Sequence, residues 1–87
     1  MIEIRKILEV QVVGNFLLEC KMENGEIFQY NMSALATRNS EMIQPLKNSY
    51  FFEQVSLEFG HLSWPNGYEI HANTVVRDGE LISKIAS

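Results

Sequence analysis

Residues 18–32, LECKMENGEIFQYNM, decide the fold, because they form two alternating segments on either side of an Asn-Gly turn. Most of the alternate positions on each side are apolar, which gives each strand one buried and one solvated face. The two-residue loop that Asn-Gly usually forms would place Cys20 opposite Gln29. A three-residue Glu-Asn-Gly loop instead pairs Cys20 with Phe28, so that the two apolar faces coincide. We therefore predict a type I turn with Gly25 left-handed in a G1 bulge.

Two further turn signals extend this pattern along the chain. Gly-Asn at residues 14–15 predicts an earlier turn, and with it a three-stranded meander over residues 4–32. Trp-Pro-Asn-Gly at residues 64–67 predicts a later hairpin. A three-residue loop there pairs Leu62 with Ile70 and keeps the large apolar side chains on one face.

The middle of the chain predicts short helices. Pro45 prevents a long helix, and residues 49–54 suit a single helical turn. The residues suited to N-caps are Ser33, Ser40, Asn48 and, for a last turn through Val76, Asn73. Helices this short depend on tertiary packing. The predicted fold class is α+β, with antiparallel β-hairpins and a meander forming a sheet and short helices packed on one face.

The length of the chain suits one domain. It has 87 residues, and residues 1–76 hold all the predicted turns and caps, so we assign them to a single α+β domain. Residues 77–87 open with Arg-Asp-Gly. We expect them to form a C-terminal tail that is weakly anchored or docks through Leu81, Ile82 and Ile85.

Composition disfavours several classes of protein. Hydrophobic residues make up 46% of the chain, which is typical of a globular domain. No apolar run reaches the ~18 residues of a membrane-spanning helix. The single cysteine cannot form an internal disulfide, so we expect a cytoplasmic protein. The net charge of −4, with 7 scattered basic residues, argues against direct binding of nucleic acid.

The order of several short motifs resembles a bacterial family of short proteins of unknown function, marked by a Trp-Pro-Asn-Gly hairpin. The motifs are Asn24-Gly25, Asn31-Met32-Ser33-Ala34-Leu35, Pro45-Leu46-Lys47-Asn48, Phe51-Phe52-Glu53-Gln54-Val55 and Trp64-Pro65-Asn66-Gly67. The resemblance covers residues 4–76 and implies an α+β fold without a known catalytic residue. It also implies that similar chains occur alone, beside another small protein, or ahead of a DNA-binding helix-turn-helix. Asn24 and Asn31 depart from the family pattern, which usually has Asp at both positions.

Two histidines form the strongest candidate for chemistry. The register that pairs Leu62 with Ile70 also places His61 opposite His71, with Glu69 on the same face. Two imidazoles and a carboxylate are suitable ligands for a divalent metal. The alternative is a pair of solvent-facing histidines near a strand end. We assign no metal site and keep these three residues as candidates. Because two facing imidazolium ions repel, we expect protonation of both to lower stability.

The sequence has no convergent catalytic set. Cys20 lies between apolar residues on its strand, so a buried structural thiol is expected. Ser63 is the one hydroxyl near either histidine in the predicted pairing, and the chain has no Gly-x-Ser-x-Gly elbow. No glycine-rich loop that could hold a phosphate is present. We therefore expect neither an enzyme nor a cofactor-binding protein.

Two adjacent aromatic residues indicate an interface. Phe51 and Phe52 cannot bury both rings on one face of a helical turn, so one could reach a neighbouring molecule. The alternative is that both rings fill the core from different sides. The leading hypothesis is a non-catalytic interaction module that binds a small protein partner or self-associates as a homo-oligomer, because antiparallel sheets leave an open edge. The alternatives are an accessory module in nucleic-acid-linked regulation and a small metal- or ligand-binding protein that uses His61 and His71.

Overall fold

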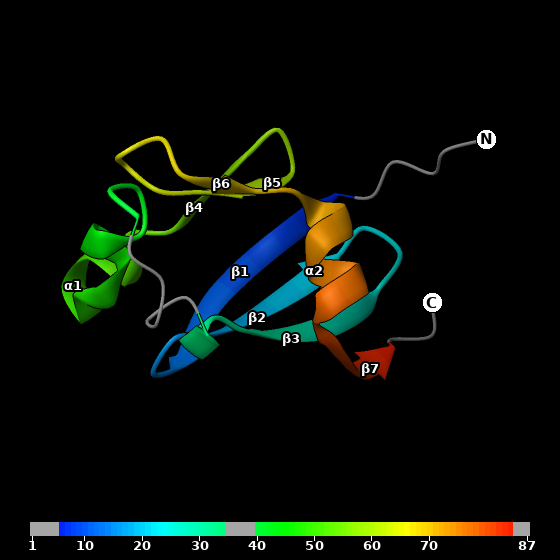
Figure 1. The fold of residues 1–87 in the computed structure, drawn as a ribbon. Coiled ribbons are helices and arrows are strands. Elements are labelled where there is room, and N and C mark those ends of the chain that lie inside the picture. Colours follow the sequence, from blue (N-terminus) through cyan, green and yellow to red (C-terminus); the bar gives the residue numbers. More distant parts are fainter. Residues whose placement is uncertain (1–5, 35–39, 85–87) are drawn as a thin grey trace.

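Two antiparallel sheets and several short helices make up the fold, which is α+β (Figure 1). The computed structural model describes residues 6–34 and 40–84. The larger sheet has the strand order β1-β2-β3-β7, formed by Ile7–Gly14, Leu17–Met22, Glu26–Asn31 and Glu80–Lys84. The smaller sheet has the order β4-β5-β6, formed by Ser56–Glu58, His61–Ser63 and Glu69–Ile70. The helical segments include η2 (Gln44–Lys47), α1 (Ser49–Phe52) and α2 (Ala72–Asp78).

The β2–β3 hairpin has the register that the alternating pattern predicts. Cys20 lies opposite Phe28. Gly25 has a φ of 90°, and its N–H donates to the carbonyl of Met22 over 3.0 Å. This register confirms the predicted three-residue loop. The loop places the apolar side chains of both strands on the same face of the sheet.

The β5–β6 hairpin also has the predicted register. Leu62 lies opposite Ile70. The N–H of Trp64 donates to the carbonyl of Tyr68 over 2.9 Å, and Gly67 has a φ of 90°. This hairpin pairs with β4 and not with the meander, so the chain forms two sheets where the sequence pattern predicted one.

Two other turns place a phenylalanine in the left-handed backbone region. At the β1–β2 turn the sequence predicted Gly14-Asn15, yet the residue with positive φ is Phe16, at 57°. At the β4–β5 turn, predicted only as a bend, Phe59 and Gly60 have φ values of 53° and 81°. Two positive φ values between paired strand ends are typical of a type I′ hairpin turn. Residues with a Cβ rarely adopt this backbone conformation, because the Cβ crowds the backbone.

The two α-helices begin differently from each other. The side chain of Asn48 caps α1 as predicted, accepting a hydrogen bond from the N–H of Tyr50 over 2.9 Å. The prediction that Asn73 caps the last helix is wrong. Asn73 lies within α2, which runs to Asp78, and its N–H donates to Nδ1 of the N-cap residue His71. Within residues 6–34 and 40–84, no helix is long and apolar enough to span a bilayer.

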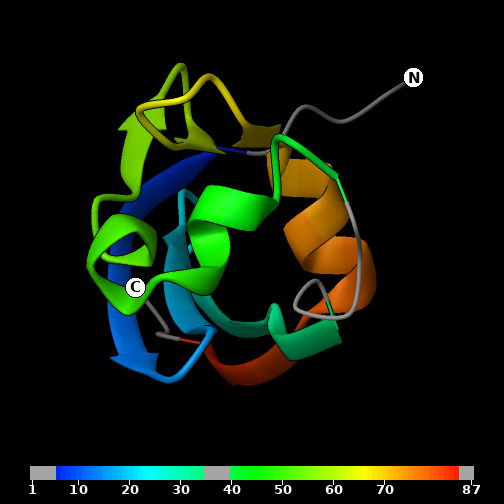
Figure 2. The ribbon, with the colours of Figure 1, turned by 60° about the vertical axis from the view of Figure 1, so that its left-hand side comes forward.

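Both sheets and the helices contribute to one core. In the turned view the sheets and α2 surround a common centre, with the helical segments η2 and α1 on the near side (Figure 2). The indole N–H of Trp64 donates to the carbonyl of Phe52 over 3.0 Å, which joins the smaller sheet to α1. The buried side chains that fill the centre are Ile7, Leu18, Cys20, Met22, Phe28, Met32, Leu46, Phe52, Leu62, Trp64, Ile70, Ala72 and Val75.

Strand β7 lies in the segment expected to form a tail. It pairs antiparallel with β3, with Leu81 opposite Phe28. All five of its side chains are exposed, so backbone pairing rather than side-chain burial holds it. The domain boundary expected at residue 76 falls inside α2. This helix runs to Asp78 and leads directly into β7.

Candidate functional site

The predicted histidine pair is brought together. The rings of His61 and His71 stack with their centroids 3.9 Å apart and their planes 30° apart. His61 comes from β5, and His71 follows β6 directly. The three-residue loop therefore places the two imidazoles side by side, as the register predicts.

Both histidines cap the start of α2. The N–H of Ala72 donates to Nδ1 of His61 over 3.0 Å, and the N–H of Asn73 donates to Nδ1 of His71 over 3.1 Å. An accepting Nδ1 carries no proton, so each neutral ring has its proton on Nε2. Burial lowers the pKa of His61, and the neighbouring His71 adds to this effect. The pair satisfies two backbone donors that the first turn of a helix leaves without partners.

This geometry does not suit a metal centre. Both Nδ1 atoms are occupied by backbone donors, and the in-plane lone pairs of stacked rings do not converge on one ion. Glu69 lies on β6, and its charge favours the protonated form of His61. Among the described residues, no group of three His, Cys, Asp or Glu side chains is placed to hold a metal.

The aromatic side chains of α1 and its neighbours differ in exposure. Phe52 is 2% exposed and belongs to the core, and Phe51 is half-buried against it. A single helical turn that directs Phe52 inward directs Tyr50 outward, and Tyr50 is 78% exposed. Among the residues that the structure describes, the most exposed large hydrophobic side chain is Phe59, at 86%. Nothing in the alternating pattern reveals this, because Phe59 follows Leu57 at the spacing of an inward residue.

The thiol of Cys20 is buried, as the pattern of its strand predicts. Burial raises the pKa of Cys20 to about 12, and the charge of Glu19 acts in the same direction. A reactive thiol needs a lowered pKa and access to solvent. Cys20 is therefore a core side chain.

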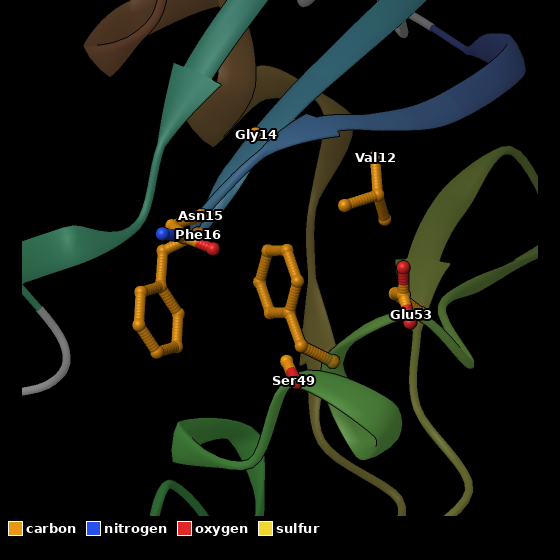
Figure 3. Close-up of a pocket in the computed structure, with 7 residues that line it drawn as sticks. Val12, Gly14, Asn15, Phe16, Ser49 and Glu53 are labelled. Atoms are coloured by element: carbon orange, nitrogen blue, oxygen red, sulfur yellow. The ribbon is translucent and has the colours of Figure 1, made fainter.

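An open pocket lies between the β1–β2 turn and α1 (Figure 3). It has a volume of about 420 Å³. Phe52 lines it together with Val12, Gly14, Asn15, Phe16, Ser49 and Glu53. The rings of Phe16 and Phe52 meet edge to face, with centroids 5.4 Å apart. Glu53 is the one charged residue of this lining, so the pocket joins an aromatic surface to a carboxylate.

The fold and these sites define a small α+β protein whose histidines and cysteine have structural positions. A family model described as a protein of unknown function (DUF2442) matches residues 7–79. The chain therefore belongs to this family of unknown function. No curated protein and no solved structure matches the chain.

Proposed function

We propose that the protein is a non-catalytic interaction module that acts through a small protein partner or by self-association, with Phe59 at the centre of its contact surface. The observation that carries this proposal is a phenyl ring that is 86% exposed on a turn where its backbone has a φ of 53°. Strained residues persist where the surroundings impose them, and they cluster at functional sites. Exposed aromatic rings are also the side chains that most often anchor protein contacts.

The Phe59 turn is held rigidly against β1. The carbonyl of Gly60 accepts a hydrogen bond from the N–H of Ile7 over 2.9 Å. A Cβ at Gly60 would lie 2.8 Å from Cγ of Lys6, so the two segments are in close contact. A backbone that is already held in place loses little conformational entropy on binding, which favours affinity.

The proposal includes the absence of catalysis. Three side chains of the kinds that most often carry catalysis have structural roles, because His61 and His71 cap α2 and the thiol of Cys20 is buried. We also propose that the helices pack on one face of the larger sheet. Phe52 and Val75 belong to the same buried cluster as Cys20 and Phe28. The opposite face of the ladder carries Glu9, Gln11, Glu19, Lys21 and Gln29.

We place this module in the bacterial cytoplasm, and the bacterial origin is what the family resemblance implies. A single unpaired cysteine suits a reducing compartment. The Trp-Pro-Asn-Gly hairpin that marks the resemblance makes structural hydrogen bonds in this chain. Trp64 donates to Phe52, and the side-chain amide of Asn66 donates to the carbonyl of Met42 over 2.9 Å.

The accessory role in nucleic-acid regulation has less support. The acidic residues on the outer face of the larger sheet, with a net charge of −4, disfavour contact with phosphates. Retardation of a DNA fragment by the wild-type protein at low salt would revive this alternative.

The first test compares solution mass over a hundredfold concentration range by sedimentation velocity. If the module self-associates, the mass of the wild type rises with concentration, and Phe59→Asn stays monomeric. Tyr50→Asn is the matched control, because it removes another largely exposed aromatic ring, from α1.

A wild type that stays monomeric throughout excludes self-association. The three proteins are then immobilised and compared for capture of a small protein from the lysate of the source cells. A protein that is retained by wild type and Tyr50→Asn and lost by Phe59→Asn supports the proposal. Equal retention by all three, or no retention, contradicts it.

A further inference from the structure

The pocket beside α1 has the chemistry of a site for a cationic side chain. Its aromatic part is the edge-to-face pair of Phe16 and Phe52, whose planes meet at 68°. Val12 and Glu53 lie on one side of the pocket, and Phe16 lies on the other (Figure 3). A long cationic side chain that spans the pocket would therefore reach a carboxylate on one side and an aromatic ring on the other.

The charge of the pocket and the net charge of the molecule both favour a positively charged ligand. No lysine, arginine or histidine is part of the pocket lining, and Glu53 is exposed at its rim. The whole chain carries a net charge of −4, which attracts cationic partners over a longer range. The volume of about 420 Å³ falls within the range of roughly 300–1,000 Å³ that is typical of binding pockets.

We propose that this pocket binds an arginine side chain of a partner protein. The guanidinium pairs with the carboxylate of Glu53 beside Val12, and the aliphatic stem packs across the pocket toward the ring of Phe16. An arginine suits the site better than a lysine, because its planar, weakly hydrated guanidinium can make two parallel hydrogen bonds to the carboxylate of Glu53.

The proposed site is separate from the Phe59 turn. Gly14, at the end of β1, lines the pocket, whereas Ile7, at the start of the same strand, bonds to the Phe59 turn. A partner could use either surface without the other. The arginine site therefore goes beyond the proposed function, and its failure can be distinguished from the failure of that proposal.

The test is a titration of ¹⁵N-labelled protein with N-acetyl-arginine amide, followed by amide chemical shifts. N-acetyl-citrulline amide is the matched probe, because it has nearly the same shape and no charge. We expect the arginine probe to shift the amides of Asn15, Phe16 and Glu53 and the citrulline probe to leave them in place.

Variants of two glutamates test the role of the carboxylate. Glu53→Gln should weaken binding of the arginine probe by about threefold or more, the size expected for one exposed ion pair. Glu23→Gln, an exposed glutamate on the β2–β3 turn, should bind the probe as the wild type does. Added salt should weaken wild-type binding and leave Glu53→Gln little changed.

Three outcomes would overturn the inference. They are equal shifts with both probes, shifts confined to residues outside the pocket, and unchanged affinity in Glu53→Gln. Phe59→Asn should bind the arginine probe normally. If Phe59→Asn no longer binds the protein partner and still binds the arginine probe with wild-type affinity, the two surfaces are independent.

Discussion

At the scale of single residues, Phe16 and Phe59 have the same backbone conformation and different surroundings. Their φ values are 57° and 53°. The ring of Phe16 packs on Phe52, whereas that of Phe59 is almost fully exposed. The left-handed region is unfavourable for both residues. Only Phe16 gains packing that offsets this cost.

Replacing Phe59 by Asn should therefore stabilise the protein. Asn tolerates positive φ, and Asn-Gly is the preferred pair for a type I′ turn. We expect the free energy of unfolding to rise by about 1 kcal/mol and the melting temperature by roughly 4–8 °C, measured by circular dichroism.

The same substitution at Phe16 is the control. Phe16→Asn relieves the same backbone strain and removes a ring that packs against the core cluster, so it should lower the melting temperature. A lower melting temperature in Phe59→Asn would show that the exposed ring makes stabilising contacts of its own.

At the scale of secondary structure, α2 joins the smaller sheet to β7 and is fixed at both ends. Two imidazoles hold its first turn. At its other end the N–H of Gly79 donates to the carbonyl of Val75 over 2.7 Å. The chain then enters β7 without an intervening loop.

The first turn of α2 should weaken in acid. Burial and His71 lower the pKa of His61 below its ordinary value of 6.5, Glu69 opposes them, and Lys6 acts with them. Glu58 on β4 lies opposite His61 in the strand pairing. Because the pKa of His61 is higher in the unfolded chain than in the folded one, the unfolded chain binds more protons. The free energy of unfolding should be constant above this pKa and fall as the pH drops through 6.5 toward the folded value.

Urea unfolding at a series of pH values measures this effect. His61→Asn is the control, because its side-chain amide oxygen occupies nearly the position of Nδ1, can accept the same N–H and does not titrate. We expect a smaller loss of stability in acid for this variant. An identical pH profile in wild type and variant would show that His61 is not the origin.

At the C-terminal end of α2, position 79 requires glycine because there is no room for a side chain. A Cβ at Gly79 would collide with the carbonyl oxygen of Val75 and lie 3.0 Å from that of Gln29. Gly79→Ala should therefore lower the free energy of unfolding by about 1–3 kcal/mol, measured by urea titration. Gly14→Ala is the matched control, since its nearest neighbour, Cβ of Leu17, would be 3.5 Å away. A change within about 0.5 kcal/mol is expected there.

Sequence patterns predict the hairpins better than they predict α2. Alternation fixes the pairing of Cys20 with Phe28, because a shift of one residue would expose one whole apolar face. The start of α2 depends on a histidine acceptor, and rules for N-caps favour Ser, Thr, Asp and Asn. The histidine pair follows from the register, but its role does not, since the sequence cannot show which backbone donors meet the rings. The pocket joins β1 to α1 and has no local signature.

At the scale of the whole molecule, β7 extends the larger sheet without entering the core. The buried cluster contains residues of both sheets and of α1 and α2, and none of Glu80–Lys84. Its pairing with β3 joins segments that are distant in sequence. The strand should therefore add stability without being required for the fold.

Truncation tests this distinction. A chain that ends at residue 79 should unfold cooperatively and keep the near-ultraviolet circular dichroism of the full chain, with a lower melting temperature. A chain that ends at residue 76 should be much less stable, because it loses the bond from Gly79 to Val75 and the last turn of α2. Loss of cooperative unfolding in the longer chain would show that β7 is essential.

The hydrogen bond between Trp64 and Phe52 gives the protein a built-in optical reporter. Trp64 is the single tryptophan of the chain, and its ring lies 6.0 Å from that of Phe52 and 5.8 Å from that of Tyr68, centroid to centroid. An indole that is 2% exposed emits at short wavelength, and its emission moves to longer wavelength when water reaches it. Fluorescence of the unlabelled protein therefore follows one junction, the contact between α1 and the smaller sheet. Separation of α1 would change the colour of the emission even while the larger sheet stayed intact.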